Sequence, residues 1–360
     1  MKILFDALQA GNRSGTGRYS EELASRLPGL AGDIEVIVEP PPARWASHSP
    51  AVRLWGARRV AYEQFGLSRL AREIGAAGVH YPANIGTAFR KSPSVVTIHD
   101  VSFFRNPGWF TLNRAMYYRV AVGQSAHTAT RVIADSTAAA DDIVNFLGIR
   151  AGKIDVIPLG VDPVFCPAPD AQCARIRERH GLPGRFFLYL GTLEPRKNLP
   201  RLIEAWSRIA IEADVDLVIA GRDGWKTGPI DRAIGSSLAR ARIHRPGFVD
   251  PADLPALLSA ATAFVWPSLC EGFGLPVLEA MACGVPVLSS NTSSIPEVTG
   301  DAAMLVDPLD IDAIANGMLR IVRDEKLRAR LRTAGPEQAR RFTWERTASM
   351  TLETYRRAFS

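Results

Sequence analysis

The sequence predicts an α/β fold built from two successive parallel sheets, each covered by helices on both faces. Short β-rich runs alternate with helical stretches along the chain, and the runs are continuously apolar, as in strands buried on both faces. A length of 360 residues is too great for one ordinary domain and suits two. The hydrophobic fraction of 47% and charged fraction of 22% exclude global disorder.

The apolar runs fall into two series, which predict two doubly wound domains. In the first series the expected strands are 2–6, 34–38, 95–99, 131–134 and 154–158, and the expected helices are 19–27, 112–126 and 138–147. In the second series the expected strands are 185–190, 215–220, 263–267, 285–289 and 303–306. We expect a first domain over 1–163, a proline- and glycine-containing linker over 164–184 and a second domain over 185–341. An amphipathic helix over 342–360 packs on its own domain or crosses back to the first.

The net charge of +6 is too small to indicate nucleic acid, but its placement is informative. The segment Pro40–Gly75 has six arginines against two glutamates and carries four aromatic residues. Cations mixed with aromatic rings suit an anionic membrane surface. A solvated helix face with a few core aromatics is an equally good explanation of the same segment.

No apolar run is long enough to span a membrane, and the apolar start MKILFDALQA is too short and too soon interrupted by Asp6 for a signal peptide. We therefore expect a cytoplasmic protein, peripheral at the inner face of the membrane if the basic segment binds lipid. Cys166, Cys173, Cys270 and Cys283 form no CxxC pair, so we expect buried thiols rather than a disulfide framework or a zinc site.

Two features of the first half are candidate ligand contacts. Gly15 and Gly17 follow the first strand and open a helix, where free amides favour an anion. A dinucleotide fingerprint is a weaker interpretation because Ser20 occupies the third glycine position, and a flexible turn is the structural alternative. His99 and Asp100 end the strand 95–99, where ligands bind in parallel sheets; His99 can contact a sugar hydroxyl or cap neighbouring carbonyls.

The most specific segment runs from Phe264 to Ser290 and predicts a strand, a glycine loop, a short helix and a strand. Pro276 suits the start of the helix, and Gly284 suits the position just after it. The loop before the helix directs amides toward an anion, while Glu271 and Glu279 offer carboxylates to hydroxyl groups. One ligand with both phosphates and hydroxyls is a nucleotide sugar.

The run EGFGLPVLEAMACGVPV resembles the retaining glycosyltransferases of family 4, and other segments agree in order over residues 1 to about 307. These are the glycine loop, TIHD at 97–100, ADS at 134–136, VIPLGVD at 156–162 and GTLEPRKN at 191–198. The resemblance implies the GT-B fold, in which two Rossmann-like domains face each other across a cleft. The donor is then held by the second domain and the acceptor by the first.

The resemblance also implies individual roles. Glu279 binds the ribose and Lys197 the donor diphosphate, while Glu271 and His99 contact the transferred sugar. The Phe273, Gly274 and Leu275 amides hold the sugar and its phosphate, and the segment with Phe248 and Val249 lies near the base.

One departure from the family pattern is Thr192, which stands where many relatives carry an arginine. Arg196, next to Lys197, can supply that second cation, because its planar fork suits a diphosphate.

The predicted reaction is a retaining glycosyl transfer that needs no cofactor and no metal. The sequence Asp214-Val-Asp216 spells a metal-binding DxD motif, but it begins a strand at the end away from ligands; Asp310 is expected to cap a helix. The GTLEPRKN run resembles bacterial mannosyltransferases of O-antigen or exopolysaccharide synthesis, which implies GDP-mannose and a saccharide or lipid-linked acceptor. A UDP-sugar donor, a nucleotide-sugar hydrolase or epimerase, a nicotinamide oxidoreductase and a non-catalytic assembly partner remain the alternatives.

Overall fold

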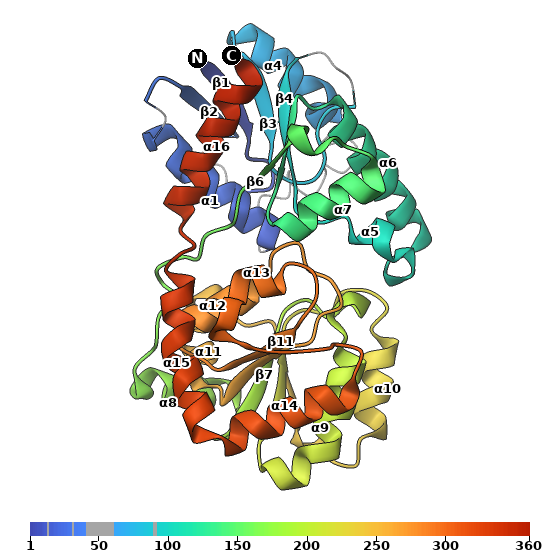
Figure 1. The fold of residues 1–360 in the computed structure, drawn as a ribbon, viewed down its shortest axis with the longest axis vertical. Helices are drawn as coiled ribbons and strands as arrows, with labels where there is room; N and C mark the ends of the chain where they lie inside the picture. The colour runs from blue at the N-terminus through green and yellow to red at the C-terminus, as the bar shows by residue number, and fades with distance from the viewer. Residues whose placement is uncertain (13, 31, 41–60, 89–91) are drawn as a thin grey trace. The chain divides into compact units, whose positions relative to one another are not determined.

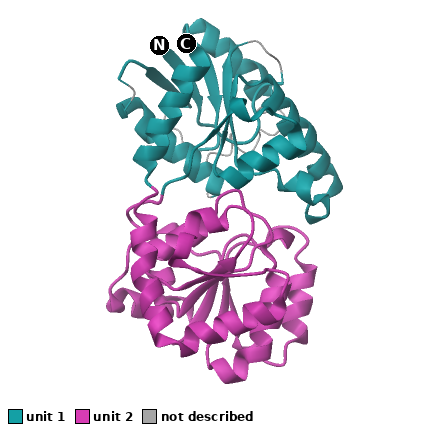
Figure 2. Cartoon of the chain, viewed as in Figure 1, with its two compact units in different colours: residues 1–160, 343–360 teal, residues 161–342 magenta. Residues whose placement is uncertain are grey.

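The computed structural model describes the chain except for residues 13, 31, 41–60 and 89–91 (Figure 1). The described chain divides into two compact units. Unit 1 comprises residues 1–160 and 343–360, and unit 2 comprises residues 161–342 (Figure 2). Each unit contains one six-stranded parallel sheet between layers of helices.

The sheet of unit 1 has the strand order β2-β1-β3-β4-β5-β6. Its strands are β1 (Lys2–Asp6), β2 (Glu35–Glu39), β3 (Gly78–Tyr81), β4 (Ser94–Ile98), β5 (Arg131–Ala134) and β6 (Ile154–Val156). Its α-helices are α1 (Gly15–Leu30), α4 (Leu67–Glu73), α5 (Ser102–Arg105), α6 (Leu112–Thr128), α7 (Thr137–Leu147) and α16 (Trp344–Phe359). The central strands β3 and β4 are buried along their whole length, and an apolar run predicted this for β4.

The sheet of unit 2 has the strand order β12-β11-β10-β7-β8-β9. Its strands are β7 (Phe186–Leu190), β8 (Asp216–Ala220), β9 (Ile243–Gly247), β10 (Ala263–Trp266), β11 (Val287–Ser290) and β12 (Met304–Val306). Its helices are α8 (Asp170–His180), α9 (Leu199–Ala213), α10 (Gly228–Ser236), α11 (Leu254–Ala260), α12 (Leu275–Ala282), α13 (Ile295–Thr299), α14 (Ile311–Arg323) and α15 (Glu325–Ala339). The chain order changes direction between β10 and β7, where open parallel sheets bind ligands.

Two strands were absent from the sequence prediction, for different reasons. β3 is only four residues long and contains His80, yet it lies between β1 and β4 and is wholly buried. The two ring nitrogens of His80 form hydrogen bonds with the hydroxyl groups of Thr97 and Tyr355, so both polar atoms of this buried side chain have partners. β9 contains Pro246 and is half-exposed, which an edge strand tolerates.

The expected linker 164–184 contains a helix, α8, that belongs to unit 2. Cys173 and Ile176 are its buried residues. Of the prolines that suggested a linker, Pro167 and Pro169 precede the helix and Pro183 follows it, and Gly181 ends the helix in the left-handed conformation. The prediction of four buried thiols was wrong for Cys166, which is exposed.

Helix α16 follows unit 2 in the sequence but packs in unit 1, against α1. Trp344 and Tyr355 on its inner face are buried, and Tyr355 shares a hydrogen bond of 2.6 Å with His80. Arg26 of α1 donates to Glu345 at 2.9 Å. Of the two placements that the sequence left open, this is the crossing one.

Most of the basic segment 40–75 lies outside the described residues, including Arg44, Arg53, Arg58 and Arg59. Of its two other arginines, Arg69 forms an ion pair with Glu73. Within the described part of the chain, no helix combines the length and hydropathy needed to cross a bilayer.

Candidate active site

A buried carboxylate, Glu271, is the centre of the charged cluster at the end of β10. One of its oxygens accepts from Lys197 Nζ at 2.7 Å and from Trp266 Nε1 at 3.1 Å, and the other accepts from Arg196 Nη1 at 2.7 Å. The cations come from the loop after β7, the strand next to β10. Parallel pairing therefore brings residues 75 positions apart into contact.

Arg196 is fixed by more than this ion pair. Its Nε and Nη2 donate to Glu194 at 3.1 and 2.8 Å, and its Nη1 also donates to the Cys270 carbonyl at 2.7 Å. Most of the five guanidinium N–H donors thus have partners within the cluster. Arg196 therefore fixes the backbone of the loop that carries Glu271 and also pairs with the Glu271 carboxylate.

Lys197 lies against an aromatic pair. Its Nζ is 4.5 Å from the centre of the Trp266 ring, and that ring stacks on Tyr189 with centroids 4.9 Å apart. Gly191 makes this packing fit, because a Cβ there would lie 2.7 Å from the Trp266 ring. An ammonium has three donors, and Glu271 takes one of them.

The cluster sets the charge state of its members. Burial by itself raises the pKa of Glu271, but Arg196 and Lys197 outweigh that effect and hold the pKa at about 2. Burial and the neighbouring Arg196 lower the pKa of Lys197 from its ordinary value. The cluster therefore places the two carboxylates Glu194 and Glu271 against the two cations Arg196 and Lys197.

Asn198 joins three strand ends around the cluster. It adopts a left-handed conformation with φ of 61°, and its Nδ2 donates to the carbonyls of Pro267 at 3.0 Å and Pro308 at 2.7 Å. Those prolines follow β10 and β12, while Asn198 follows β7. The strained backbone is thereby compensated by two buried hydrogen bonds.

The glycine loop after Glu271 leads into α12 as predicted. Gly274 precedes the helix at φ of 111°, Pro276 lies in its first turn and Gly284 follows it at φ of 67°. Ser294 of the next loop donates to the carbonyls of Glu271 and Phe273 at 3.0 and 2.8 Å. The backbone amides of this loop and of the start of α12 therefore lie beside the charged cluster, where the helix dipole favours the binding of an anion.

In unit 1, both ring nitrogens of His99 are already bonded. Nδ1 lies 2.7 Å from Asp135 Oδ2, and Nε2 lies 2.9 Å from the Pro82 carbonyl. Burial lowers the pKa of His99, but Asp135 outweighs it and the net direction is upward. Because the Asp135 carboxylate and the Pro82 carbonyl are both acceptors, both ring nitrogens of His99 donate, as they do in the protonated imidazole.

Two family models together match most of the chain. The model described as Glycosyltransferase Family 4 matches residues 13–165, and the model described as Glycosyl transferases group 1 matches residues 174–338. An Escherichia coli protein named O-antigen chain mannosyltransferase B is 30% identical over 95% of this chain and 96% of its own. The chain belongs to glycosyltransferase family 4.

Other comparisons agree with this family. A Mycolicibacterium hassiacum protein named MMP alpha-(1->4)-mannosyltransferase is 30% identical over 62% of this chain and 53% of its own. The crystal structure of Anabaena HepE in complex with UDP-glucose matches with a TM-score of 0.75 at 22% identity, covering 99% of this chain and all of its own. The fold is accordingly GT-B, and the chain is a glycosyltransferase.

The remaining residues expected in this glycosyltransferase's site differ in how accessible their side chains are. Glu279 lies in α12 and is buried, four residues after the start of the helix. Phe273 is buried too, and its ring packs on Phe342 with centroids 5.7 Å apart, so its backbone rather than its ring is available to a sugar. Phe248 is exposed beneath the Arg222 guanidinium, while Val249 belongs to the core.

The N-terminal glycines of the glycosyltransferase have a structural use. Gly15 begins α1, and a Cβ at Gly17 would lie 1.8 Å from the Asn12 carbonyl oxygen. Gly17 is therefore required for its own loop to close on the helix, whether or not a ligand binds there.

The DxD motif at 214–216 is held in ion pairs, and the expected helix cap Asp310 is observed. Asp216 accepts from Arg242 at 2.7 Å and lies 2.7 Å from His244, and Asp310 caps α14 as predicted. Among the described residues, no group of three or more His, Cys, Asp or Glu is placed to hold a metal ion.

Sequence reasoning missed Glu194, Trp266, Asn198 and the Ser293–Ser294 pair. Trp266 ends a buried strand, which is the usual place for a site residue, but no sequence motif indicated that its ring N–H pairs with Glu271. Ser293 Oγ accepts from the Glu271 amide at 2.9 Å at a left-handed φ of 50°, and non-glycine left-handed positions cannot be identified from composition.

Proposed function

We propose that this glycosyltransferase moves a mannosyl residue from GDP-mannose to a saccharide or lipid-linked saccharide acceptor, with retention of configuration. The observation that carries the proposal is the buried Glu271–Arg196–Lys197 cluster beside the start of α12. Support for mannose comes from the mannosyltransferase name of the Escherichia coli relative. By the same resemblance, the acceptor belongs to O-antigen or exopolysaccharide synthesis at the inner face of the membrane.

In the proposed reaction, the bond between the sugar C1 and the β-phosphate oxygen breaks, and the phosphate leaves with the electron pair. The acceptor oxygen bonds to C1 on the same face, and its proton passes to the leaving phosphate. Lys197, the Gly274 and Leu275 amides and the α12 dipole stabilise the charge that develops on that phosphate. No metal and no separate base is needed.

Glu271 and Arg196 act together in this proposal. Glu271 accepts a hydrogen bond from a hydroxyl group of the sugar, and Arg196 keeps the carboxylate ionised and oriented. Glu279 contacts the ribose. Because Glu279 lies one turn into the buried helix α12, its carboxylate must extend toward the N-terminal end of that helix to do so. A sugar hydroxyl at His99 must replace the Pro82 carbonyl as the partner of Nε2.

A nucleotide panel tests the donor. A ligand raises the melting temperature by mass action, so GDP at a hundred times its dissociation constant stabilises by about 2.7 kcal/mol. We expect GDP to raise the melting temperature more than UDP or ADP does at equal concentration. We also expect GDP-mannose to be consumed only when an acceptor is present. A larger shift with UDP would replace the donor assignment, and rapid donor breakdown in water would indicate a hydrolase instead.

A further inference from the structure

An apolar stripe on α6 faces solvent, although α6 belongs to the folded core of unit 1. Leu112, Met116, Tyr117 and Val120 are 74%, 59%, 48% and 67% exposed. At 3.6 residues per turn they lie within an arc of about 140°, opposite the buried Ala115 and its neighbours. Clustered exposed apolar side chains of this kind mark an interaction surface.

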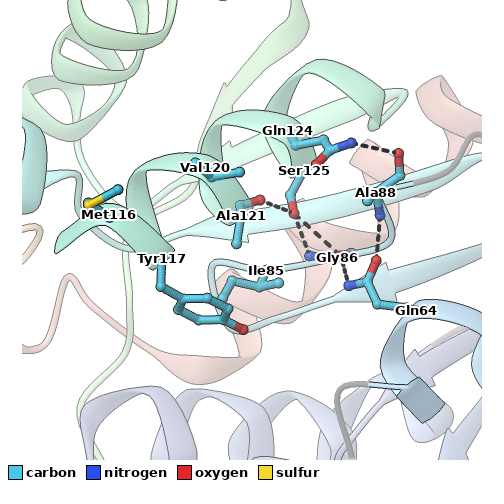
Figure 3. Close-up of a pocket in the computed structure, with 10 residues that line it drawn as sticks. All are labelled: Gln64, Ile85, Gly86, Ala88, Met116, Tyr117, Val120, Ala121, Gln124 and Ser125. Atoms are coloured by element: carbon cyan, nitrogen blue, oxygen red, sulfur yellow. Dashed lines mark hydrogen bonds between the residues drawn. The ribbon is translucent and has the colours of Figure 1, made fainter. Parts of the chain in front are cut away.

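A hollow of about 370 Å³ continues the stripe toward the loop between β3 and β4 (Figure 3). Met116, Tyr117 and Val120 line it together with Ile85 and Ala121, among others. Three of the four exposed residues of the stripe therefore border one cavity.

The polar side chains of Gln64 and Ser125 bond to the backbone around the hollow rather than facing a ligand. Gln64 bonds to the Gly86 carbonyl at 2.8 Å and accepts from the Ala88 amide at 2.7 Å. Ser125 Oγ accepts from the Gly86 amide at 2.9 Å and donates to the Ala121 carbonyl at 2.7 Å. The part left for an occupant is mainly hydrocarbon, which excludes a free sugar as the preferred ligand.

The charge around the stripe selects among apolar partners. Residues 101–130 contain no Asp or Glu and three arginines. Arg114 and Arg119 lie on the two sides of the apolar arc and stack over the rings of Tyr118 and Phe104, at 5.6 and 4.9 Å. Arg105 is balanced by Asp142 of α7. A helix face with an apolar centre and cationic flanks fits an anionic lipid surface.

We propose that α6 is a membrane-docking helix: its apolar stripe enters the headgroup region of an anionic bilayer, and the adjoining hollow takes up hydrocarbon. This inference depends on the proposed function only for the kind of acceptor, because a lipid-linked acceptor is found at such a surface. It assigns lipid contact to described residues outside the basic segment 40–75.

Sedimentation with lipid vesicles tests the proposal without nucleotide sugar, so it is independent of the donor assignment. We expect binding to vesicles of phosphatidylethanolamine with phosphatidylglycerol and at least tenfold weaker binding to phosphatidylcholine alone. The triple variant Leu112→Gln, Met116→Gln, Val120→Gln should lose at least tenfold in binding to the anionic vesicles. Arg114→Gln with Arg119→Gln should weaken binding about 30-fold at low salt, which corresponds to about 1 kcal/mol per arginine.

The matched control replaces three exposed apolar residues of unit 2 by Gln: Ile211, Leu238 and Leu309. We expect this control to bind vesicles as the unaltered chain does. Both triple variants should keep the melting temperature of the unaltered chain and the increase in it that GDP causes. The proposal is overturned if the unaltered chain does not bind anionic vesicles or binds neutral ones equally. It is also overturned if the α6 triple variant binds undiminished, or if that variant abolishes a dimer, which would make a second copy the partner.

Discussion

Replacing Glu271 by Gln tests whether the carboxylate organises the charged cluster or only fills it. Its pKa of about 2 lies about 2.5 units below its ordinary 4.5. At 1.36 kcal/mol per unit, the ionised form contributes about 3 kcal/mol to folding. The carboxylate is 8% exposed, so little solvent screening reduces this value. For a unit of this size the loss lowers the melting temperature by roughly 6–12 °C.

The assay combines thermal unfolding, GDP binding and mannosyl transfer on the same variant. We expect transfer to be lost, while GDP binding is kept or strengthened because Arg196 and Lys197 no longer have their shared carboxylate. Glu204→Gln is the control, since that residue forms an exposed ion pair with Arg208 and should cost less than 1 kcal/mol.

The pH dependence follows from the same shift. Because the folded pKa of Glu271 is depressed, its contribution is fully present above about pH 4.5 and is lost as the pH falls toward 2. The Gln variant should therefore differ less from the unaltered chain at pH 2 than at pH 6. Near-normal transfer, or an equal stability difference at both pH values, would refute the reasoning.

Three further substitutions probe the same site. Lys197→Met removes a charged donor, so GDP should bind about tenfold to a hundredfold more weakly by calorimetry; unchanged affinity would remove Lys197 from the diphosphate site. Gly191→Ala places a Cβ 2.7 Å from the Trp266 ring and should cost about 1–3 kcal/mol in urea unfolding, whereas Gly184→Ala, with open space around it, should not. Asn198→Ala leaves two buried proline carbonyls without their donor and should cost about 2–3 kcal/mol; a smaller loss by thermal melting would show that water replaces the amide.

The limits of the sequence prediction follow from what sets each strand. After Arg131 the run 131–134 is apolar, and it predicted β5 with its observed bounds because its other three residues are buried and are recognised by hydropathy alone. β3 needs partners from elsewhere: His80 is buried at a pKa of about 3, lowered by burial and by His99, and Tyr355 from the far end of the chain bonds to its ring. Hydrogen bonds to residues that are distant in the sequence leave no pattern in the local sequence around His80.

The candidate site shows the same division. Glu271, Lys197 and the α12 start were placed from motifs, because capping glycines and prolines act over a few residues. That Arg196 and Lys197 bind Glu271 itself was not foreseen, since the motifs assigned the cations to phosphate and the carboxylate to sugar. Pairing across neighbouring strands depends on register, which the sequence does not specify for loops.

The return of α16 to unit 1 has a consequence for biosynthesis. Unit 2 is one continuous stretch, whereas unit 1 has a segment 343–360 that emerges from the ribosome after all of unit 2. Until then, the Tyr355 partner of His80 and the Thr354 donor to Asp155 do not exist, and the α1 face that packs on α16 is open to water. Domains fold as units during synthesis. The first 160 residues are made before unit 2, yet unit 1 completes its fold only once the segment 343–360 has been made.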